Sequence, residues 1–476
     1  MIPIESCADF KSILTKNATV CYYLTKDLNC TGQPISPIGS GSSSFEGGFD
    51  GRNHKITGLS LLPRDDFVGL FAYVSRATIL NLTLEDVSVE SGAYFVSALA
   101  SYTFDSHILN CHLTASAGKV SVVQGKGSLN VAGFVSNARS THFHNCTLQN
   151  TVILNDNGPS GGVLGRGLAC SICHATHLGN SNGEVLVESK NYAGGLVGLC
   201  EQCSIFKSGI VEGKVNAVEQ VAGGVAAKFV DPVQVEELYA SSSVLVNANR
   251  GFAGGIFGWV EIDNGTHVFD NCYSRATVSG MNNLGGMFGV FKFGANNGTS
   301  LLLSHCYAYI VIYTSSVTDF FGAILGNLAA DSPNYTLSFS NVFFLNNLNN
   351  GLGNGKTSTD GSSVVPLKCD PLYEAILDNF PHTVWGGDRL RIEYGYKFGE
   401  NTCFRPPPDD SWKLGLALGL LIPFSMGAIA FLGIWIYFRR QTPYSSTLQT
   451  QPIEINEIET ADESENIERS QTEPIN

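Results

Sequence analysis

Charged side chains are scarce in this sequence, and it contains no run of basic residues. Asp, Glu, Lys and Arg make up 15% of its 476 residues, and the formal net charge is −14. A chain that binds nucleic acid needs a basic patch for the phosphates, so this composition excludes that class. The low charge and the 52 glycines also argue against long exposed helices and favour a turn-rich β architecture.

The N-terminus lacks the apolar core and cleavage site of a secretory signal peptide. Only Ile2, Pro3 and Ile4 are apolar in the first few positions, which is too short a run for that role. An uncharged segment near the C-terminus and several glycosylation sequons before it nevertheless indicate a large exported domain. We therefore expect a first segment outside this sequence to supply the export signal; insertion by a C-terminal helix alone is the alternative.

One uncharged segment near the C-terminus is long enough to cross a membrane. Residues 414–438 contain no charged side chain, and as a helix they would span roughly 37 Å. Trp435 lies near one end, where aromatic rings favour the interface. We expect a transmembrane helix over residues 412–438 rather than a buried core helix. Gly415 and Gly419 form a small-xxx-small pair, which favours a weak homodimer.

The flanking charges predict the orientation of this helix. Two aspartates precede it, and Arg439 and Arg440 follow it directly. Positive charge is retained in the cytoplasm, so residues 1–411 are expected outside a plasma membrane. The tail, residues 439–476, carries eight carboxylates against three arginines and is predicted to be disordered and cytoplasmic.

Glycosylation sequons agree with this orientation, because all of them precede the helix. An exported chain carries N-linked glycans at Asn-x-Ser/Thr. The predicted acceptors are Asn17, Asn29, Asn81, Asn145, Asn264, Asn297 and Asn334.

A cluster of small residues between apolar ones recurs nine times. Successive clusters are separated by steps of 28, 36, 29, 33, 29, 31, 31 and 37 residues. The aligned small residues are Gly69, Ser97, Gly133, Gly162, Gly195, Gly224, Gly255, Gly286 and Ala323. A period of about 30 residues predicts a repeat architecture.

Each repeat also contains short apolar-polar alternations, which predict strands. Three short strands in about 30 residues match one coil of a parallel β-helix, whereas a β-propeller blade, the alternative, usually needs about 40. Glycine suits a sharp corner, where the backbone needs positive φ or a close approach. We predict an all-β solenoid over residues 45–365, an N-terminal cap over 1–44, and a C-terminal cap and stalk over 366–411.

The opening of the repeat region resembles a known family. Residues 45–59 read FEGGFDGRNHKITGL, and the later clusters include GLVG and GIFG. These elements resemble the GLUG-motif proteins, over roughly residues 4–400. The resemblance implies a right-handed parallel β-helix of the pectin-lyase-like kind, on adhesin-like bacterial or protist surface proteins, and it brings no catalytic residues.

All thirteen cysteines precede the membrane segment, where disulfides are normally stable. The disulfide candidates lie in the two caps: Cys7, Cys21, Cys30, Cys369 and Cys403. Five others fall in one slot of the repeat, which Phe206 and Val342 fill in other copies. That slot is therefore predicted to be apolar and inward-facing, with a column of buried free thiols: Cys111, Cys146, Cys173, Cys272 and Cys306. Disulfides between neighbouring coils are the alternative.

Three local patterns suggest chemistry, and each has a simpler explanation. Residues 170–174 match the c-type haem string CxxCH, but nothing places a second axial ligand. Cys170-x-x-Cys173 and Cys200-x-x-Cys203 have zinc-like spacing, yet they are one repeat apart, so stacking or a local disulfide explains them. Asp65 and Asp66 could act as paired carboxylates, but they fall in a loop. We predict no cofactor, no metal and no catalytic set.

These features together predict a single-pass type I cell-surface glycoprotein. Its extracellular β-helix is expected to bind a surface glycan or a protein, as in adhesion. A membrane-tethered carbohydrate-active enzyme and a passive coat protein are the alternatives. An exposed aromatic strip would favour a binder, and clustered carboxylates would favour an enzyme.

Overall fold

The computed structural model describes residues 1–11, 13, 19–62, 66–178, 186–296, 298–309, 311–314, 321–331, 335–345 and 365–367. The chain divides into two units, residues 1–405 and 406–476, and the described residues all belong to the first. The predicted transmembrane helix, its tail and most of the C-terminal cap therefore lie outside the described residues. Within those residues, no helix has the length and apolar character needed to cross a membrane.

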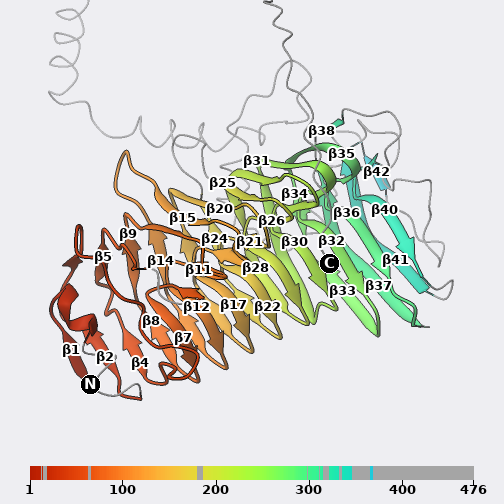
Figure 1. Ribbon diagram of the computed structural model, residues 1–476. Helices are drawn as coiled ribbons and strands as arrows, with labels where there is room; N and C mark the ends of the chain where they lie inside the picture. The colour runs from red at the N-terminus through yellow and green to blue at the C-terminus, as the bar shows by residue number, and fades with distance from the viewer. Residues whose placement is uncertain are drawn as a thin grey trace, which may run out of the picture. The chain divides into compact units, whose positions relative to one another are not determined.

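The first unit is a parallel β-solenoid of about nine turns. One sheet holds nine strands, one per coil (Figure 1), and all of its neighbours pair in parallel. These strands are β7 (Phe71–Ser75), β12 (Ala100–Phe104), β17 (Val135–Arg139), β22 (Leu164–Leu168), β27 (Val197–Glu201), β30 (Ala226–Val230), β32 (Phe257–Ile262), β36 (Phe288–Phe293) and β40 (Leu325–Ala330). The nine predicted glycine clusters lie immediately before these nine strands. The coil prediction is confirmed, and the propeller alternative is wrong.

The remaining strands form a second, 33-stranded sheet that wraps the other sides of each coil. The strands just before the glycine corner are β6 (Phe67–Val68), β11 (Phe95–Ser97), β16 (Asn130–Ala132), β21 (Ser160–Gly161), β26 (Tyr192–Gly194), β29 (Val221–Gly223) and β39 (Phe321–Gly322). Those that follow the nine-stranded sheet are β8 (Thr78–Leu80), β13 (His107–Leu109), β18 (His142–His144), β23 (Ser171–Cys173), β28 (Ser204–Ala217), β31 (Gln234–Gly254), β33 (Thr266–Asp270), β37 (Thr299–Ala308) and β41 (Tyr335–Leu345).

Two further sets of strands complete each turn. The first is β9 (Thr83–Glu85), β14 (His112–Thr114), β19 (Thr147–Leu148), β24 (Thr176–His177) and β34 (Tyr273–Ser274). The second is β10 (Ser88–Ser91), β15 (Ser121–Gly125), β20 (Thr151–Asn155), β25 (Leu186–Ser189), β35 (Thr277–Gly285), β38 (Val311–Thr314) and β42 (Val365–Leu367). A coil such as β11–β15 thus contains five short strands rather than the predicted three, because sharp corners divide the chain more often than hydropathy alone indicates.

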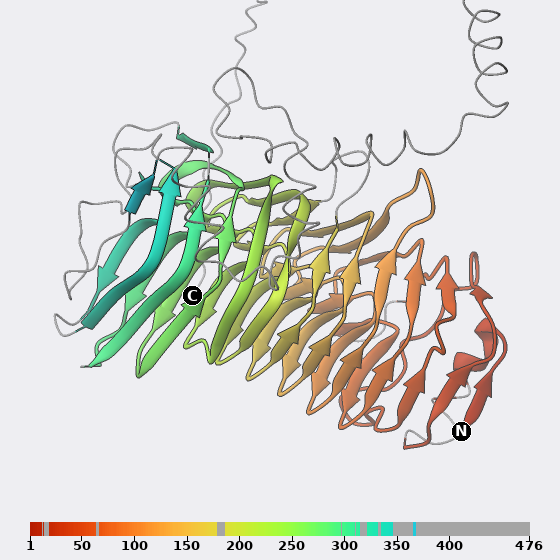
Figure 2. The ribbon, with the colours of Figure 1, turned by 180° about the vertical axis from the view of Figure 1, so that it is seen from behind.

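The predicted N-terminal cap extends the stack. Strand β1 (Ile2–Ile4) pairs in parallel with β2 (Tyr22–Leu24), and β2 pairs with β4 (Gly48–Asp50). Strand β3 (Leu28–Asn29) pairs likewise with β5 (Lys55–Thr57). Between β1 and β2 lies the 3-10 helix η1 (Cys7–Asp9). Seen from behind in Figure 2, these strands continue the same row of coils.

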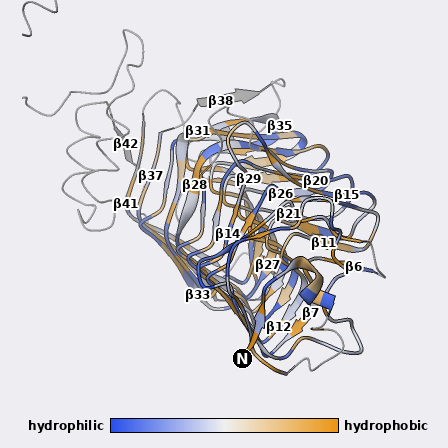
Figure 3. Cartoon of the chain, turned by 90° about the vertical axis from the view of Figure 1, so that its left-hand side faces the viewer, coloured by the Kyte–Doolittle hydropathy of each residue, from blue (hydrophilic) through white to orange (hydrophobic). Residues whose placement is uncertain are grey.

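The core is built from columns of apolar residues, one residue from each coil. One column runs through nine laterally paired positions, all buried: Phe49, Ile79, Ile108, Phe143, Ile172, Ile205, Val235, Phe269 and Leu303. Viewed from its N-terminal side in Figure 3, the unit shows these coils one behind another. Each such side chain contributes roughly 1.5–3 kcal/mol on burial, and no coil could bury its own column without a neighbour.

The glycine corner is a close contact between backbones of successive coils. A Cβ on Gly195 would collide with the carbonyl oxygen of Gly224, and a Cβ on Gly224 would collide with that of Gly255. None of these three glycines has positive φ. Of the two reasons considered for glycine at this corner, close approach is therefore the one that applies.

Positive φ occurs at other corners, and asparagine is frequent there. Asn81, Asn110 and Asn145 follow β8, β13 and β18 with φ of 54°, 51° and 52°. Asparagine tolerates this left-handed region better than most residues. The side-chain amides also form a ladder: Asn145 donates to Asn110 over 3.0 Å, and Asn110 donates to Asn81 over 3.1 Å.

The corner contact predicts a large cost for one added methyl group. Gly224→Ala should lower the free energy of unfolding by about 3 kcal/mol, because the new Cβ forces adjacent coils apart. Gly41→Ala is the matched control, since a Cβ there meets nothing within 4 Å. Urea unfolding followed by circular dichroism measures both variants, and equal midpoints would contradict this account of the corner.

Candidate binding surface

Four aromatic side chains gather on the outer surface of the N-terminal coils. Phe67 and Phe95 stack with ring centroids 5.2 Å apart, and Tyr73 and Tyr102 stack at 4.6 Å. An edge contact of 6.3 Å between Phe67 and Tyr73 joins the two pairs. All four rings are half-buried, while neighbouring residues such as Val74 point inward. Strand alternation therefore turns a run of apolar residues outward here.

Two exposed apolar residues lie beside these rings. Tyr94 precedes Phe95 and is 50% exposed, and Leu129 is 47% exposed. The Leu129 amide donates to the Tyr94 carbonyl over 2.8 Å, so these residues occupy adjacent coils. We call these six residues the aromatic patch: Phe67, Tyr73, Tyr94, Phe95, Tyr102 and Leu129. Contiguous exposed apolar surface of this kind marks interaction sites in soluble domains.

The row of lateral neighbours that contains Tyr73 and Tyr102 carries an aromatic residue again further along the solenoid, and so does the row that contains Phe67 and Phe95. Successive lateral pairings run from Tyr73 and Tyr102 to Lys228 and Trp259. The Lys228 ammonium lies 4.7 Å from the Trp259 ring centroid, and Phe252 packs edge-on against that ring at 5.5 Å. Between the two groups the column holds Asn137, Arg166 and Leu199. The outer face thus offers aromatic rings at two places, separated in this column by Asn137, Arg166 and Leu199.

A group of carboxylates lies on the other sheet. Glu236 and Asp270 are lateral neighbours on β31 and β33, and Glu237 occupies the adjoining corner with φ of 54°. Burial raises the pKa of Glu237; the charges of Glu236 and Asp270 raise it further, and Lys207 opposes them. Asp270 Oδ1 lies 2.9 Å from His305 Nδ1. Sequence analysis missed this group, because its members become neighbours only through lateral pairing.

Only one member of the acidic pair predicted in a loop lies among the described residues. Residues 63–65, and therefore Asp65, lie outside the described residues. Asp66 is described, and its backbone carbonyl accepts a hydrogen bond from Phe95. Within the described part of the chain, no three His, Cys, Asp or Glu side chains are grouped so as to hold a metal ion.

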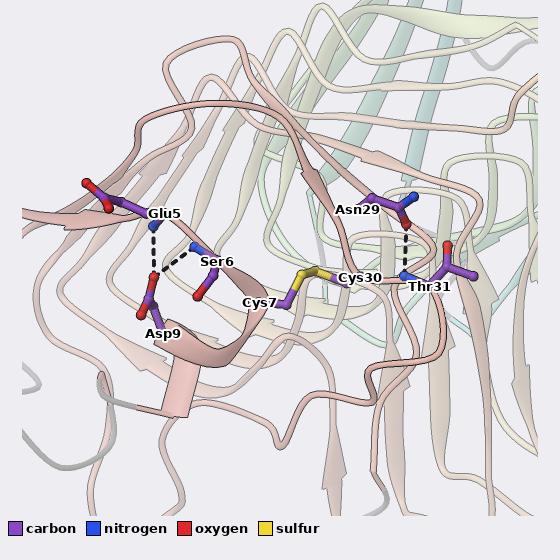
Figure 4. Close-up of a disulfide and its surroundings, with 7 residues drawn as sticks. All are labelled: Glu5, Ser6, Cys7, Asp9, Asn29, Cys30 and Thr31. Carbon is purple, nitrogen blue, oxygen red and sulfur yellow. Dashed lines mark hydrogen bonds between the residues drawn. A yellow bond between two sulfur atoms is a disulfide. The ribbon is translucent and has the colours of Figure 1, made fainter.

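The N-terminal disulfide joins two of the five cap candidates. Cys7 bonds to Cys30, with Cα atoms 5.7 Å apart, and ties η1 to the loop after β3 (Figure 4). Cys21 is free and exposed, so the prediction that it forms a disulfide is wrong. Cys7 and Cys30 bond to each other, and Cys21 therefore has no cysteine partner among the described cap residues. Cys369 and Cys403 lie outside the described residues.

Four of the five predicted column cysteines share an inward slot after a left-handed corner. Cys111, Cys146, Cys272 and Cys306 are all free and buried. Burial raises the pKa of the Cys111 thiol to about 12 and also raises those of Cys146 and Cys272. Val342 occupies the slot in the next coil, as expected, because it pairs laterally with Cys306.

Cys173 was placed in this column wrongly, and so was Phe206. Cys173 is free and buried, as predicted, but it pairs laterally with His144 and Phe206, so it lies before the corner and not in the inward slot. The left-handed residue of that coil is His174, with φ of 54°. The inward slot therefore falls two residues later and is filled by Ala175, which is fully buried.

The zinc-like cysteine spacing is explained by a local disulfide. Cys200 bonds to Cys203 within one coil, while Cys170 and Cys173 of the preceding coil are free. Cys170 is buried, and burial raises its pKa to about 11. Both cysteines of the haem-like string 170–174 are buried, and Cys170 belongs to the hydrophobic core cluster.

The described sequons differ in how their amide groups are used. Asn29 and Asn264 are exposed, and the Asn29 side-chain oxygen accepts from the Thr31 amide. Asn81 and Asn145 belong to the corner ladder, and each donates through the Nδ2 that a glycan would occupy. Asn17, Asn297 and Asn334 lie outside the described residues.

One histidine is buried in the core. His177 takes the inward position between Leu148 and Ile210 of the adjacent coils. Its Nδ1 lies 3.0 Å from the Gly195 carbonyl, so Nδ1 carries the proton and donates. Its Nε2 has no hydrogen-bond partner among the described residues. Burial lowers the pKa of His177 to about 4, against a smaller opposing contribution from the Gly195 hydrogen bond.

Comparison with known proteins gives a partial match. No family model matches the chain. An immunoglobulin A1 protease from Streptococcus sanguinis is 26% identical over 255 residues, which is 49% of this chain and 13% of that protein. A crystal structure from Bacteroides ovatus, provisionally assigned as an immunoglobulin A1 protease, covers 79% of this chain and 86% of its own, with 16% identity and a TM-score of 0.31. The sequence match supports a distant relationship to the streptococcal protein, while the solenoid assignment rests on the strand pairings themselves.

The buried histidine predicts acid sensitivity. Because the folded pKa of about 4 lies below the unfolded value near 6.5, the unfolded chain binds a proton first as pH falls. The free energy of unfolding should therefore fall by about 3 kcal/mol as the pH is lowered from 6.5 to 4. His177→Leu should remove this part of the decline in urea unfolding, whereas replacing the exposed His142 with Gln should not. An unchanged pH slope in His177→Leu would contradict the assignment.

Proposed function

We propose that this chain is a cell-surface binding protein whose solenoid holds its ligand through the outer face that carries the aromatic patch. The observation that carries the proposal is the outward stacking of Phe67 with Phe95 and of Tyr73 with Tyr102 on adjacent coils. Half-exposed rings fixed by lateral pairing offer apolar contact at little cost in side-chain entropy. The hydroxyl groups of Tyr73 and Tyr102, and neighbouring side chains such as that of Asn137, add hydrogen-bonding partners.

The ligand class that suits this surface is a glycan, with a protein as the second possibility. Sugar rings present apolar C–H faces beside hydroxyl groups, which match aromatic rings flanked by amide and charged side chains. A coat protein would have no need to keep these rings together on one surface. The distant relationship to the streptococcal protein is compatible with a shared binding module, and no proteolytic activity is transferred, since the match spans 13% of that protein.

The setting of this binding surface is also part of the proposal. We place residues 1–411 outside the plasma membrane, with the helix over 412–438 as anchor and the acidic tail inside. The right-handed winding and the GLUG relationship belong to the same proposal, supported by the opening element at residues 45–59 and by the glycine corners.

The aromatic patch predicts a specific loss of binding. Tyr73→Ala combined with Tyr102→Ala should weaken retention of the purified chain on a glycan array or on cells by at least about tenfold, because truncated central aromatic contacts typically cost 2 kcal/mol or more. Val233→Ala is the control, since Val233 is 72% exposed and lies outside the aromatic patch. Matching melting curves for the variants would show that the fold is intact.

Two outcomes count against this proposal. Equal retention of the double variant and the wild type would exclude the aromatic patch as the binding surface. Failure of the wild-type chain to bind any glycan, cell or surface protein would remove the adhesion role altogether.

A carbohydrate-active enzyme is the second candidate, favoured by the raised pKa of Glu237 beside Glu236 and Asp270. A carboxyl group of raised pKa can act as a general acid, with a partner carboxylate as base or nucleophile. If so, Glu237→Gln should reduce polysaccharide cleavage by at least about 100-fold, while Glu90→Gln, at an exposed position, should not. Reducing-end assays on a polysaccharide panel measure this, and no cleavage by the wild type would dismiss the enzyme.

A further inference from the structure

Two rows of outer side chains flank the glycine corners along the solenoid. The row after the corner, which we call the tyrosine row, consists of lateral neighbours on successive coils: Tyr73, Tyr102, Asn137, Arg166, Leu199, Lys228 and Trp259. The row before the corner begins with Phe67 and Phe95. It continues in register to Tyr192 and Phe252.

The two rows contact each other across the corner at both ends of this stretch. Phe67 meets Tyr73 edge to face with ring centroids 6.3 Å apart, and Phe252 meets Trp259 in the same way at 5.5 Å. All four rings are half-buried. Outward side chains on the two sides of a corner meet only where the corner brings the outer faces of both strands toward each other. The rows therefore form one continuous strip, which we call the seam.

The middle of the seam combines hydrogen-bonding groups with apolar surface. Between Tyr102 and Trp259, the tyrosine row includes the amide of Asn137 and the half-buried side chain of Leu199, and the other row adds the ring of Tyr192. Ring faces supply apolar contact, while the amide and the phenol hydroxyl donate and accept hydrogen bonds. A sugar chain offers C–H faces and hydroxyl groups at every unit, so the seam suits a run of sugar units rather than one terminal sugar.

The spacing of the coils sets the length of the ligand that the seam would hold. Five lateral steps separate Tyr102 from Trp259, and at about 4.8 Å per step they span roughly 24 Å. One unit of an extended 1,4-linked sugar chain advances by about 5 Å, which is close to one step between coils. A chain that contacts both rings therefore needs about six units.

The basic side chains of the seam are already paired with carboxylates. Arg166 Nη2 lies 3.0 Å from Glu201 Oε1, and Lys228 Nζ lies 3.0 Å from Glu261 Oε2. A chain of anionic sugars would have to lie beside these carboxylates, on a protein whose net charge is −14. Like charges side by side disfavour binding, so the seam favours a neutral sugar chain over a polyanionic one.

We propose that the seam binds a neutral, linear polysaccharide that lies along the solenoid axis over about six sugar units. Trp259 is the subsite farthest from the aromatic patch. This inference rests on the proposed glycan-binding function and adds the length and the charge of the ligand to it. Contacts at both ends of the seam with one chain reinforce each other, because the second contact is made within a complex that already exists.

Titration calorimetry of the full chain tests the length, with β-1,4-linked oligosaccharides of glucose, mannose and N-acetylglucosamine from disaccharide to octasaccharide as probes. Affinity should rise by at least about tenfold between the tetrasaccharide and the heptasaccharide, because only the longer chains reach Trp259. Trp259→Ala should remove this rise and retain tetrasaccharide binding, which also shows that the variant is folded. Tyr23→Ala is the matched control, since Tyr23 likewise has a cation over its ring, Arg52 at 3.6 Å, but lies outside the seam.

Oligogalacturonates of the same lengths test the charge, because each unit carries a carboxylate. They should bind at least about tenfold more weakly than the neutral chains. Equal or tighter binding of the galacturonates, or an affinity that does not rise beyond the tetrasaccharide, would overturn the seam and leave the aromatic patch as a site for a short glycan. A wild-type chain that binds none of these probes would overturn the seam, and failure on the wider glycan array and on cells would remove the proposed function as well.

Discussion

The backbone contact at the glycine corner is the constraint on which the rest of this structure depends. At the glycine corners from Gly133 to Gly255, the carbonyl oxygen of the next coil lies where a Cβ would have to be, as between Gly224 and Gly255. The lack of a side chain at those glycines lets the backbones of adjacent coils approach to the spacing of paired strands. Once they do, every lateral register is set, since a slip of one residue would turn a column of apolar side chains from the core to solvent.

Register converts distance along the sequence into contact in space. Residues separated by about 30 positions become lateral neighbours, so each column is a row of side chains on one surface. Inside, these rows form the apolar core; outside, they bring together groups such as Tyr73 with Tyr102 and Glu236 with Asp270. Candidate sites in this fold are therefore assembled across coils, and a substitution in one coil alters a surface that its neighbours share.

Much of the architecture was predictable from the sequence, because the nine glycine clusters precede the nine strands of one sheet. The side chains that meet on the candidate surfaces were harder to predict from the sequence. Phe67 and Phe95 are 28 residues apart, which equals the step between the first two clusters, and this signal could have revealed the stacked pair. The Glu237 group required the same alignment in coils whose corners have unequal loop lengths.

The error at Cys173 shows why alignment on residue type is weaker than alignment on corners. Cys111 and Cys146 both follow a left-handed asparagine, but the equivalent corner of the next coil is His174, and Cys173 precedes it. Cys173 is two residues before the inward slot of its coil. A shift of two residues preserves the apolar-polar alternation that sequence patterns detect, yet it places the residue on the other side of the corner. The same corner geometry bears on the sequons. The Asn81 amide donates to Asp50, and the Asn145 amide donates to Asn110. A glycan at either position would replace a hydrogen bond between successive coils, whereas Asn29 and Asn264 lie outside these contacts.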